Sequence, residues 1–133
     1  MSFTQSAFIR KNTSELIEKL LSLGYEKGNY SLNIPITSVC YGETNSFFDR
    51  EPYPEGIDCR ENEELFLAIA ALRDDSDYMQ WFTDGGDVWF KCGDKTCVYG
   101  IKYYQNKYNK QIHKATVAEL IDHFGSDINV GSK

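Results

Sequence analysis

The feature that most constrains the fold is an apolar run from Leu65 to Leu72. In a helical conformation, the run carries apolar side chains around nearly its whole circumference. The small side chains of Ala68, Ala70 and Ala71 keep the diameter of this helix small. A helix that is apolar on all sides is buried on all sides. Glutamates crowd the start of the run, where the helix dipole favours negative charge. We therefore expect this helix to be the central element of the core.

Two more helices are indicated by their end signals. Asn12 in the N-cap position places Glu15 at the third helical position, and Gly24 supplies a left-handed stop. Near the other end of the chain, the segment Thr116–Glu119 has the spacing of a capping box, and Gly125 ends the apolar pattern. Each segment carries an apolar face at helical spacing, so both predict amphipathic helices.

The hydrophobic period changes to two between the second and third helices. Tyr78–Phe82 and Val88–Cys92 have the pattern of two strands, joined by a turn at Asp84–Asp87 that contains two glycines. Val98–Tyr104 has the composition of a third strand. This stretch therefore predicts a three-stranded antiparallel meander that is rich in aromatic residues.

The remaining segments complete the predicted architecture. Tyr30–Tyr41 contains β-favouring residues, but Pro35 restricts it to an edge strand, and Gly42–Glu55 has the composition of a long irregular loop. We expect a single α+β domain over residues 1–133. Its three helices would pack on a mostly antiparallel sheet of about five to six strands that includes the aromatic meander.

Charge and hydropathy exclude several classes of partner. The net charge is −6 and the pI is about 4.9, which disfavours binding to nucleic acid and to anionic membrane surfaces. No apolar run approaches the roughly 20 residues of a membrane span. The first residues also lack the basic and apolar regions of a secretory signal. We therefore expect a cytoplasmic protein with no nucleic-acid partner and no membrane partner.

Four cysteines raise the question of disulfides or zinc: Cys40, Cys59, Cys92 and Cys97. In a chain without a secretory signal, reduced buried thiols are the preferred interpretation. The four residues between Cys92 and Cys97 would also fit half of a zinc site. The second half would have to come from the other cysteines or from His113 and His123, none of which form a close pair. We therefore expect no metal.

No catalytic motif is recognisable, so we assign no catalytic residue and no cofactor. The cluster Asp74, Asp75 and Asp77 could hold a divalent cation, and a metal-dependent hydrolase is one alternative. Aspartates at such positions also serve ordinary turn chemistry, which is the preferred interpretation.

The concentration of aromatic residues in the predicted meander is the feature that points to a binding role. In alternating strands, Phe82, Val88 and Phe90 would lie on one face and be buried. The other face would expose a candidate ligand or partner site consisting of Trp81, Trp89, Tyr99, Lys102, Tyr103 and Tyr104. Tyrosine and tryptophan are enriched at the centres of interfaces. Ordinary cross-strand aromatic packing beneath the helices is the preferred interpretation of these side chains, because aromatic residues are common in strands.

Three segments also carry a resemblance: residues 8–13, 62–75 and 113–116. With them the chain resembles small uncharacterised α+β proteins of gut-bacterial genomes and their prophages. The likeness rests on cap-and-helix signatures, so it implies a phage or mobile-element setting and transfers no site residue.

The leading hypothesis is a non-enzymatic binding protein that uses the aromatic sheet face for a protein partner or for self-association. The alternative is sequestration of a small nucleotide-like ligand, as an anti-defence sponge would do, by aromatic stacking and the nearby lysines.

Overall fold

The computed structural model describes residues 5–27, 39–41, 46–48, 56–74, 76–93 and 97–125. The four helices found there are α1 (Ser14–Leu23), α2 (Glu63–Ala70), α3 (Val98–Tyr108) and α4 (Val117–Phe124). The eight strands in the same described residues are β1 (Ala7–Ile9), β2 (Glu26–Lys27), β3 (Val39–Tyr41), β4 (Ser46–Phe48), β5 (Ile57–Asp58), β6 (Trp81–Thr83), β7 (Trp89–Lys91) and β8 (His113–Lys114).

The predicted end signals position two of these helices, α1 and α4. The Thr13 hydroxyl accepts the Leu16 N–H at 3.1 Å, so the N-cap of α1 lies one residue after the predicted Asn12. Gly24 ends α1 in the left-handed conformation, as predicted. At α4 the capping box of Thr116 and Glu119 is formed in both directions, which also confirms the prediction.

The first sheet has five strands in the order β2-β4-β3-β1-β5. β1 lies antiparallel to β3 and parallel to β5, and β3 lies antiparallel to β4. The interpretation of residues 42–55 as an irregular loop is wrong at β4, because pairing with β3 and β2 makes residues 46–48 a strand. Most of the segment 30–41 lies outside the described residues, but β3 is its last part. The prediction of an edge strand is wrong for this part, because β3 pairs with β4 on one side and β1 on the other.

The second sheet has three strands in the order β7-β6-β8. β6 and β7 form the predicted antiparallel hairpin, with Phe82 opposite Phe90. The prediction of the third strand at residues 98–104 is wrong, because those residues belong to α3. The third strand is β8, which pairs antiparallel with β6 from the other side.

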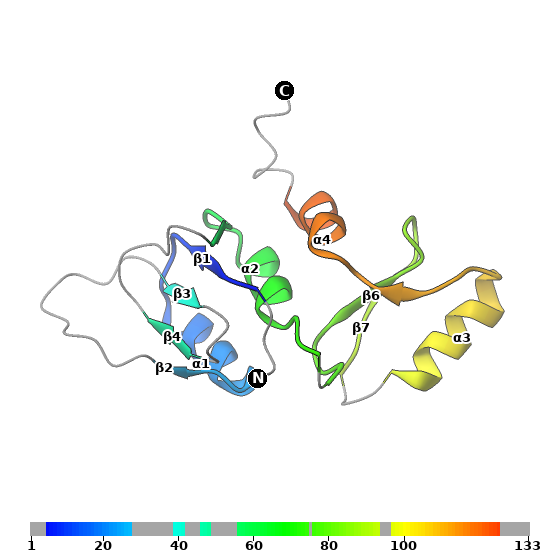
Figure 1. The fold of residues 1–133 in the computed structure, drawn as a ribbon, viewed down its shortest axis with the longest axis horizontal. Coiled ribbons are helices and arrows are strands. Elements are labelled where there is room, and N and C mark those ends of the chain that lie inside the picture. Colours follow the sequence, from blue (N-terminus) through cyan, green and yellow to red (C-terminus); the bar gives the residue numbers. More distant parts are fainter. Residues whose placement is uncertain are drawn as a thin grey trace, which may run out of the picture.

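Two hydrophobic clusters lie on either side of this hairpin. The larger is built around α2, whose Leu65, Phe66 and Ile69 are fully buried, as predicted for the central helix. The smaller contains Phe82, Val88, Cys92, Cys97 and Ile112. Figure 1 shows the two sheets toward opposite ends of the long axis, with α2 and α4 between them and α3 beyond the second sheet.

The structure therefore confirms the α+β class and corrects the predicted layout. The chain has four helices in its described part rather than three, and its strands form two sheets rather than one. The error has one main source, which is that the β-branched and aromatic residues of Val98–Tyr104 favour a strand although the segment forms a helix.

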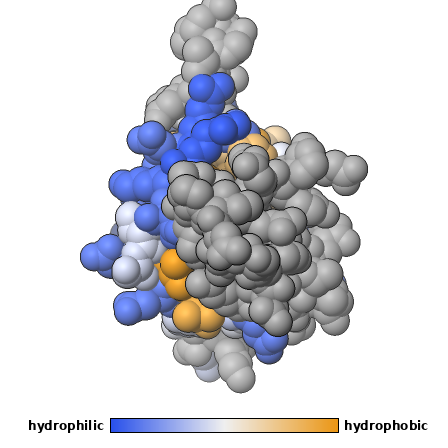
Figure 2. Space-filling model, turned by 90° about the vertical axis from the view of Figure 1, so that its left-hand side faces the viewer, coloured by the Kyte–Doolittle hydropathy of each residue, from blue (hydrophilic) through white to orange (hydrophobic). Residues whose placement is uncertain are grey.

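Figure 2 views the molecule from the end that carries the first sheet. The described residues visible there are predominantly hydrophilic, with hydrophobic ones in small groups. Among the described helices, none is long and apolar enough to cross a membrane.

Candidate functional site

The exposed aromatic surface of the described residues lies on α3. Among the described residues the exposed large hydrophobics are Leu21, Val98, Tyr99, Tyr103 and Tyr108, so all but Leu21 belong to α3. No residue of α3 is buried. An 11-residue helix that buries none of its side chains fully has an unusually open surface.

We call one stripe of this helix the α3 outer face, and its residues follow i, i+3, i+4, i+7, i+8 spacing. They are Tyr99, Lys102, Tyr103, Asn106 and Lys107. All five side chains are exposed, and Tyr99 is 88% exposed. The α3 outer face therefore combines two tyrosines with two lysines on a convex surface.

The opposite face of α3 is held by aromatic stacking. The Tyr104 ring lies parallel to that of Phe90, with ring centroids 4.6 Å apart, and Phe90 in turn stacks on Phe82. Gly100 permits this close approach, because a Cβ there would lie 3.1 Å from the Phe90 ring. These contacts hold α3 over the hairpin and leave its outer face toward solvent.

A disulfide between Cys92 and Cys97 joins the end of β7 to the start of α3. The prediction of reduced thiols is wrong for this pair, and the bonded sulfurs are not available as zinc ligands. Cys59 is a buried free thiol, and burial raises its pKa to about 12. Disulfides are rare in the reducing cytosol, so this pair argues against the expected cytoplasmic location.

Positive charge is concentrated along α3. No acidic residue occurs from Cys97 to Lys110, a segment with three lysines, whereas the rest of the chain carries eleven basic and twenty acidic residues. Lys107 Nζ lies 5.5 Å from the Tyr103 ring centre and 5.3 Å from that of Tyr108. It donates to the Tyr103 hydroxyl at 3.3 Å, and this bond raises the pKa of Lys107. Lys102 has no charged partner among the described residues.

The structure separates the six predicted site residues into three places. Tyr99, Lys102 and Tyr103 lie together on the α3 outer face. Tyr104 points inward and stacks on the hairpin. The rings of Trp81 and Trp89 pack against α4 and the large cluster, although Trp89 also lines a hollow beside α3. The single exposed sheet face that we predicted is therefore not formed, because its third strand is a helix.

The two tryptophans are partly buried by α4. Trp81 meets Phe124 edge-on at 5.1 Å, and the Trp89 ring stacks on His123 at 3.9 Å. Trp89 also donates its indole N–H to the Gly86 carbonyl at 3.0 Å. These contacts fit the cross-strand and helix-packing alternative for the tryptophans.

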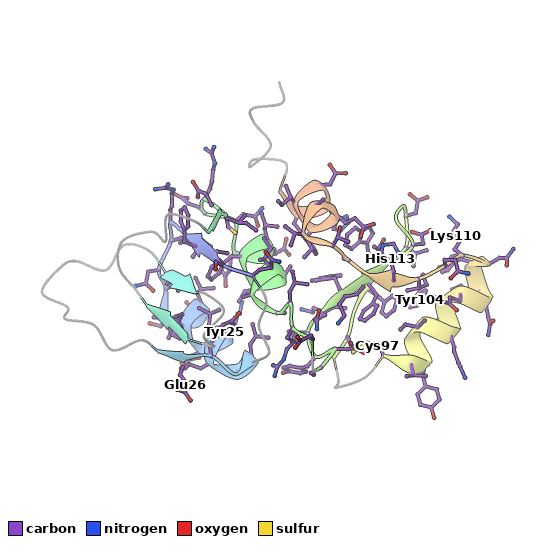
Figure 3. All side chains as sticks on the ribbon, in the orientation of Figure 1. Tyr25, Glu26, Cys97, Tyr104, Lys110 and His113 are labelled. Carbon is purple, nitrogen blue, oxygen red and sulfur yellow. A yellow bond between two sulfur atoms is a disulfide. The ribbon has the colours of Figure 1, made fainter. Side chains whose placement is uncertain are left out.

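A hollow of about 370 Å³ lies beside the C-terminal half of α3, lined by Asp87, Val88, Trp89, Tyr104, Tyr108 and Lys110. Figure 3 shows Tyr104 and Lys110 on this side of the molecule, between the second sheet and α3. Lys110 pairs with Asp84 at 3.2 Å, so its charge is already engaged. Asp84 also accepts the N–H groups of Gly86 and Val88, and the first of these bonds is the main cause that lowers its pKa.

A second cavity, which no local sequence pattern indicates, lies on the other side of the hairpin. It measures about 290 Å³ and is lined by α1, α2, the turn before β6, the hairpin and α4. Its lining residues come from five separate segments, so no spacing along the chain could have indicated it. Met79, Trp81, Lys91 and Phe124 are among them.

The metal-dependent alternative gains no support from the described residues. No group of three side chains that could hold a metal ion occurs among them. Asp77 is engaged by Lys114 at 3.5 Å, Asp74 is exposed, and Asp75 lies outside the described part of the chain.

Comparisons with protein-family models, with curated proteins and with solved structures found no match. The resemblance to small proteins of gut-bacterial genomes and prophages therefore stays a prediction.

Proposed function

We propose that this protein is a non-enzymatic binding module whose α3 outer face docks on an acidic segment of another protein. The observation that carries the proposal is the exposure of Tyr99 and Tyr103 beside Lys102 and Lys107 on a helix that buries no residue. Large apolar groups exposed together on a monomer mark interaction surfaces, and tyrosine supplies much of the energy at interface centres.

The charge of the α3 outer face defines the chemistry of the partner. Its two lysines have no carboxylate partner among the described residues, so carboxylates of another molecule would meet them without displacing an existing pair. Complementary charge of this kind sets specificity and speeds association. The net charge of −6 opposes nucleic acid as the partner.

Self-association through two copies of this face is disfavoured for the same reason. In a symmetric dimer the same patch meets itself, so Lys102 and Lys107 would face lysines of the second copy. We therefore place another protein, rather than a second copy, on the α3 outer face. The proposal assigns no catalytic residue, and the phage or mobile-element setting remains an expectation from the resemblance.

The test is selection from a random-peptide display library on the immobilised protein, with the double variant Lys102→Glu/Tyr103→Ser beside wild type. Wild type should enrich peptides that combine acidic and apolar residues, and the variant should bind them about tenfold more weakly or worse. A matched control is Lys11→Glu/Leu21→Ser, which makes the same charge change at exposed positions at the other end of the molecule.

Two results would overturn the proposal. One is enrichment of peptides that bind both double variants as well as wild type. The other is a wild-type dimer in light scattering that Lys102→Glu/Tyr103→Ser dissociates, because that result would place a second copy on the face.

A further inference from the structure

The cavity of about 290 Å³ between α1, α2, α4 and the hairpin has the composition of a small-molecule site. We call it the interhelical cleft. Its lining is Lys19, Ser22 and Leu23 from α1, Glu64, Leu67 and Ala68 from α2, and Met79, Trp81, Lys91 and Phe124. Ligand sites are largely apolar with a few polar groups, and about 300 Å³ is the lower end of their usual size. The volume therefore fits a ligand of one or two rings.

The apolar part of the cleft is aromatic and rigid. Trp81 is fixed by edge contacts to Phe124 and Trp89, with ring centroids 5.1 and 6.4 Å away. Leu67 and Ala68 belong to the central helix of the core, where Ala68 is buried. Such a surface offers a flat ring both apolar burial and edge or stacking contacts.

Of the two lysines that line the cleft, one is paired with a carboxylate and the other is not, among the described residues. Lys19 pairs with Glu63 at 3.1 Å, so its charge is already matched. Lys91 has no carboxylate partner among the described residues, and its Nζ lies 5.6 Å from the centre of the Trp81 ring. Glu64 lines the α2 side and would repel an anion there. An anionic group would therefore be held at Lys91, beside Trp81.

Backbone strain at Met79 is a second and independent observation. Met79 has a φ of 64°, in the left-handed region that bulky residues rarely adopt. Its N–H donates to the Cys92 carbonyl at 2.6 Å, and the Cys92 N–H donates to the Gln80 carbonyl at 2.8 Å. These two bonds hold the strained turn against the end of β7. Residues kept in such conformations cluster at ligand sites, and methionine adapts well to varied apolar ligands.

We propose that the interhelical cleft binds a small aromatic anion, with its ring against Trp81 and Phe124 and its negative group at Lys91. This site is separate from the α3 outer face, because the two lie on opposite sides of the hairpin. The ligand class is defined by its chemistry, namely one or two aromatic rings that carry a single acidic group.

The test is NMR titration of the nitrogen-labelled protein with three probes of one shape: naphthoate, naphthalenemethanol and naphthylmethylammonium. Only naphthoate should shift the Met79 and Lys91 amides and the Trp81 indole N–H strongly and saturably. The protein has two tryptophans, so Trp89→Phe assigns the Trp81 indole signal. Lys91→Gln removes the charge-assisted bond and should therefore weaken naphthoate binding about tenfold or more.

Lys11→Gln is the matched control, since it removes the same charge from an exposed position outside both proposed binding sites and should leave naphthoate binding unchanged. Tighter binding of the ammonium probe, equal binding of all three probes, equal weakening by the two lysine variants or an absence of saturable shifts would each overturn the proposal.

Discussion

Tyr25 shows how one buried polar atom ties the first helix to the core. Its side chain is 2% exposed, and its hydroxyl donates to the Ala70 carbonyl at 2.6 Å, at the last residue of α2. Figure 3 labels Tyr25 at the inner side of the first sheet. The carbonyl it meets lies at a helix end, where backbone acceptors lack partners within the helix. This bond therefore satisfies a group that burial would otherwise leave unpaired.

Tyr25→Phe should lower the free energy of unfolding by about 1 to 2 kcal/mol, because the apolar ring remains while a buried acceptor loses its donor. Urea unfolding followed by circular dichroism measures the change. Tyr99→Phe removes the same atom from a side chain that is 88% exposed and should stay within about 0.5 kcal/mol of wild type. Equal effects of the two substitutions would show that the Tyr25 hydroxyl contributes nothing specific.

At the scale of elements, the capping box of α4 has a titratable member. Burial disfavours the charged form of Glu119, but the Thr116 N–H at 3.0 Å and the His113 ring at 2.9 Å outweigh it, so the pKa of Glu119 is lowered from its ordinary 4.5. Stability that depends on ionised Glu119 is therefore complete above pH 4.5. It is lost as the pH falls through the lower folded-state pKa.

Glu119→Gln should accordingly reduce the free energy of unfolding by up to about 1 kcal/mol at neutral pH. The difference from wild type should shrink toward zero as the pH falls below the folded-state pKa of Glu119, because the wild-type carboxyl is then neutral as well. Urea midpoints for both proteins across the acid range provide the measurement. A difference that stays constant down to about pH 3 would contradict the role given to the charge.

The same elements show which parts of the fold the sequence could predict. The caps at Gly24, Thr116 and Gly125 could be found because capping depends on residues within one turn. The helix α3 could not be recognised from Val98–Tyr104, where β-branched and aromatic residues favour a strand. The contact that decides for a helix is the stack of Tyr104 on Phe90, which lies on another element. Ile101, Tyr104 and Tyr108 at i, i+3 and i+7 are the helical signal that was present.

The candidate sites divide along the same line. Tyr99, Lys102 and Tyr103 were predicted from composition and do lie together, but on a helix rather than on a sheet. The interhelical cleft depends on five segments that meet only in the folded chain, so Lys91 and Met79 carried no sequence signal.

At the scale of the whole molecule, the hairpin β6–β7 connects two unequal clusters. Trp81 and Trp89 pack against the large cluster around α2, and Phe82 belongs to the small cluster beneath α3. α2 has five buried residues and α3 has none. The free energy of local opening depends on how many side chains a segment buries, so segments with few buried side chains open more easily than the core. The protein should therefore have a graded stability, with α3 as its least protected helix.

Amide hydrogen exchange under native conditions should show this gradient, with α2 exchanging only through global unfolding and α3 through local opening at lower free energy. The Cys92–Cys97 bond limits that opening by tethering the start of α3 to β7. Closing so short a loop is worth about 2 kcal/mol in the chain-entropy account. Reduction, or the Cys92→Ser/Cys97→Ser variant, should therefore lower the protection of α3 amides by a comparable amount and leave that of α2 amides nearly unchanged.

Because the α3 outer face is part of this helix, the same loss of order should weaken the binding of peptides to that face. Equal protection of α2 and α3, before and after reduction, would instead show that both clusters unfold as one unit and that the disulfide does not control the docking helix.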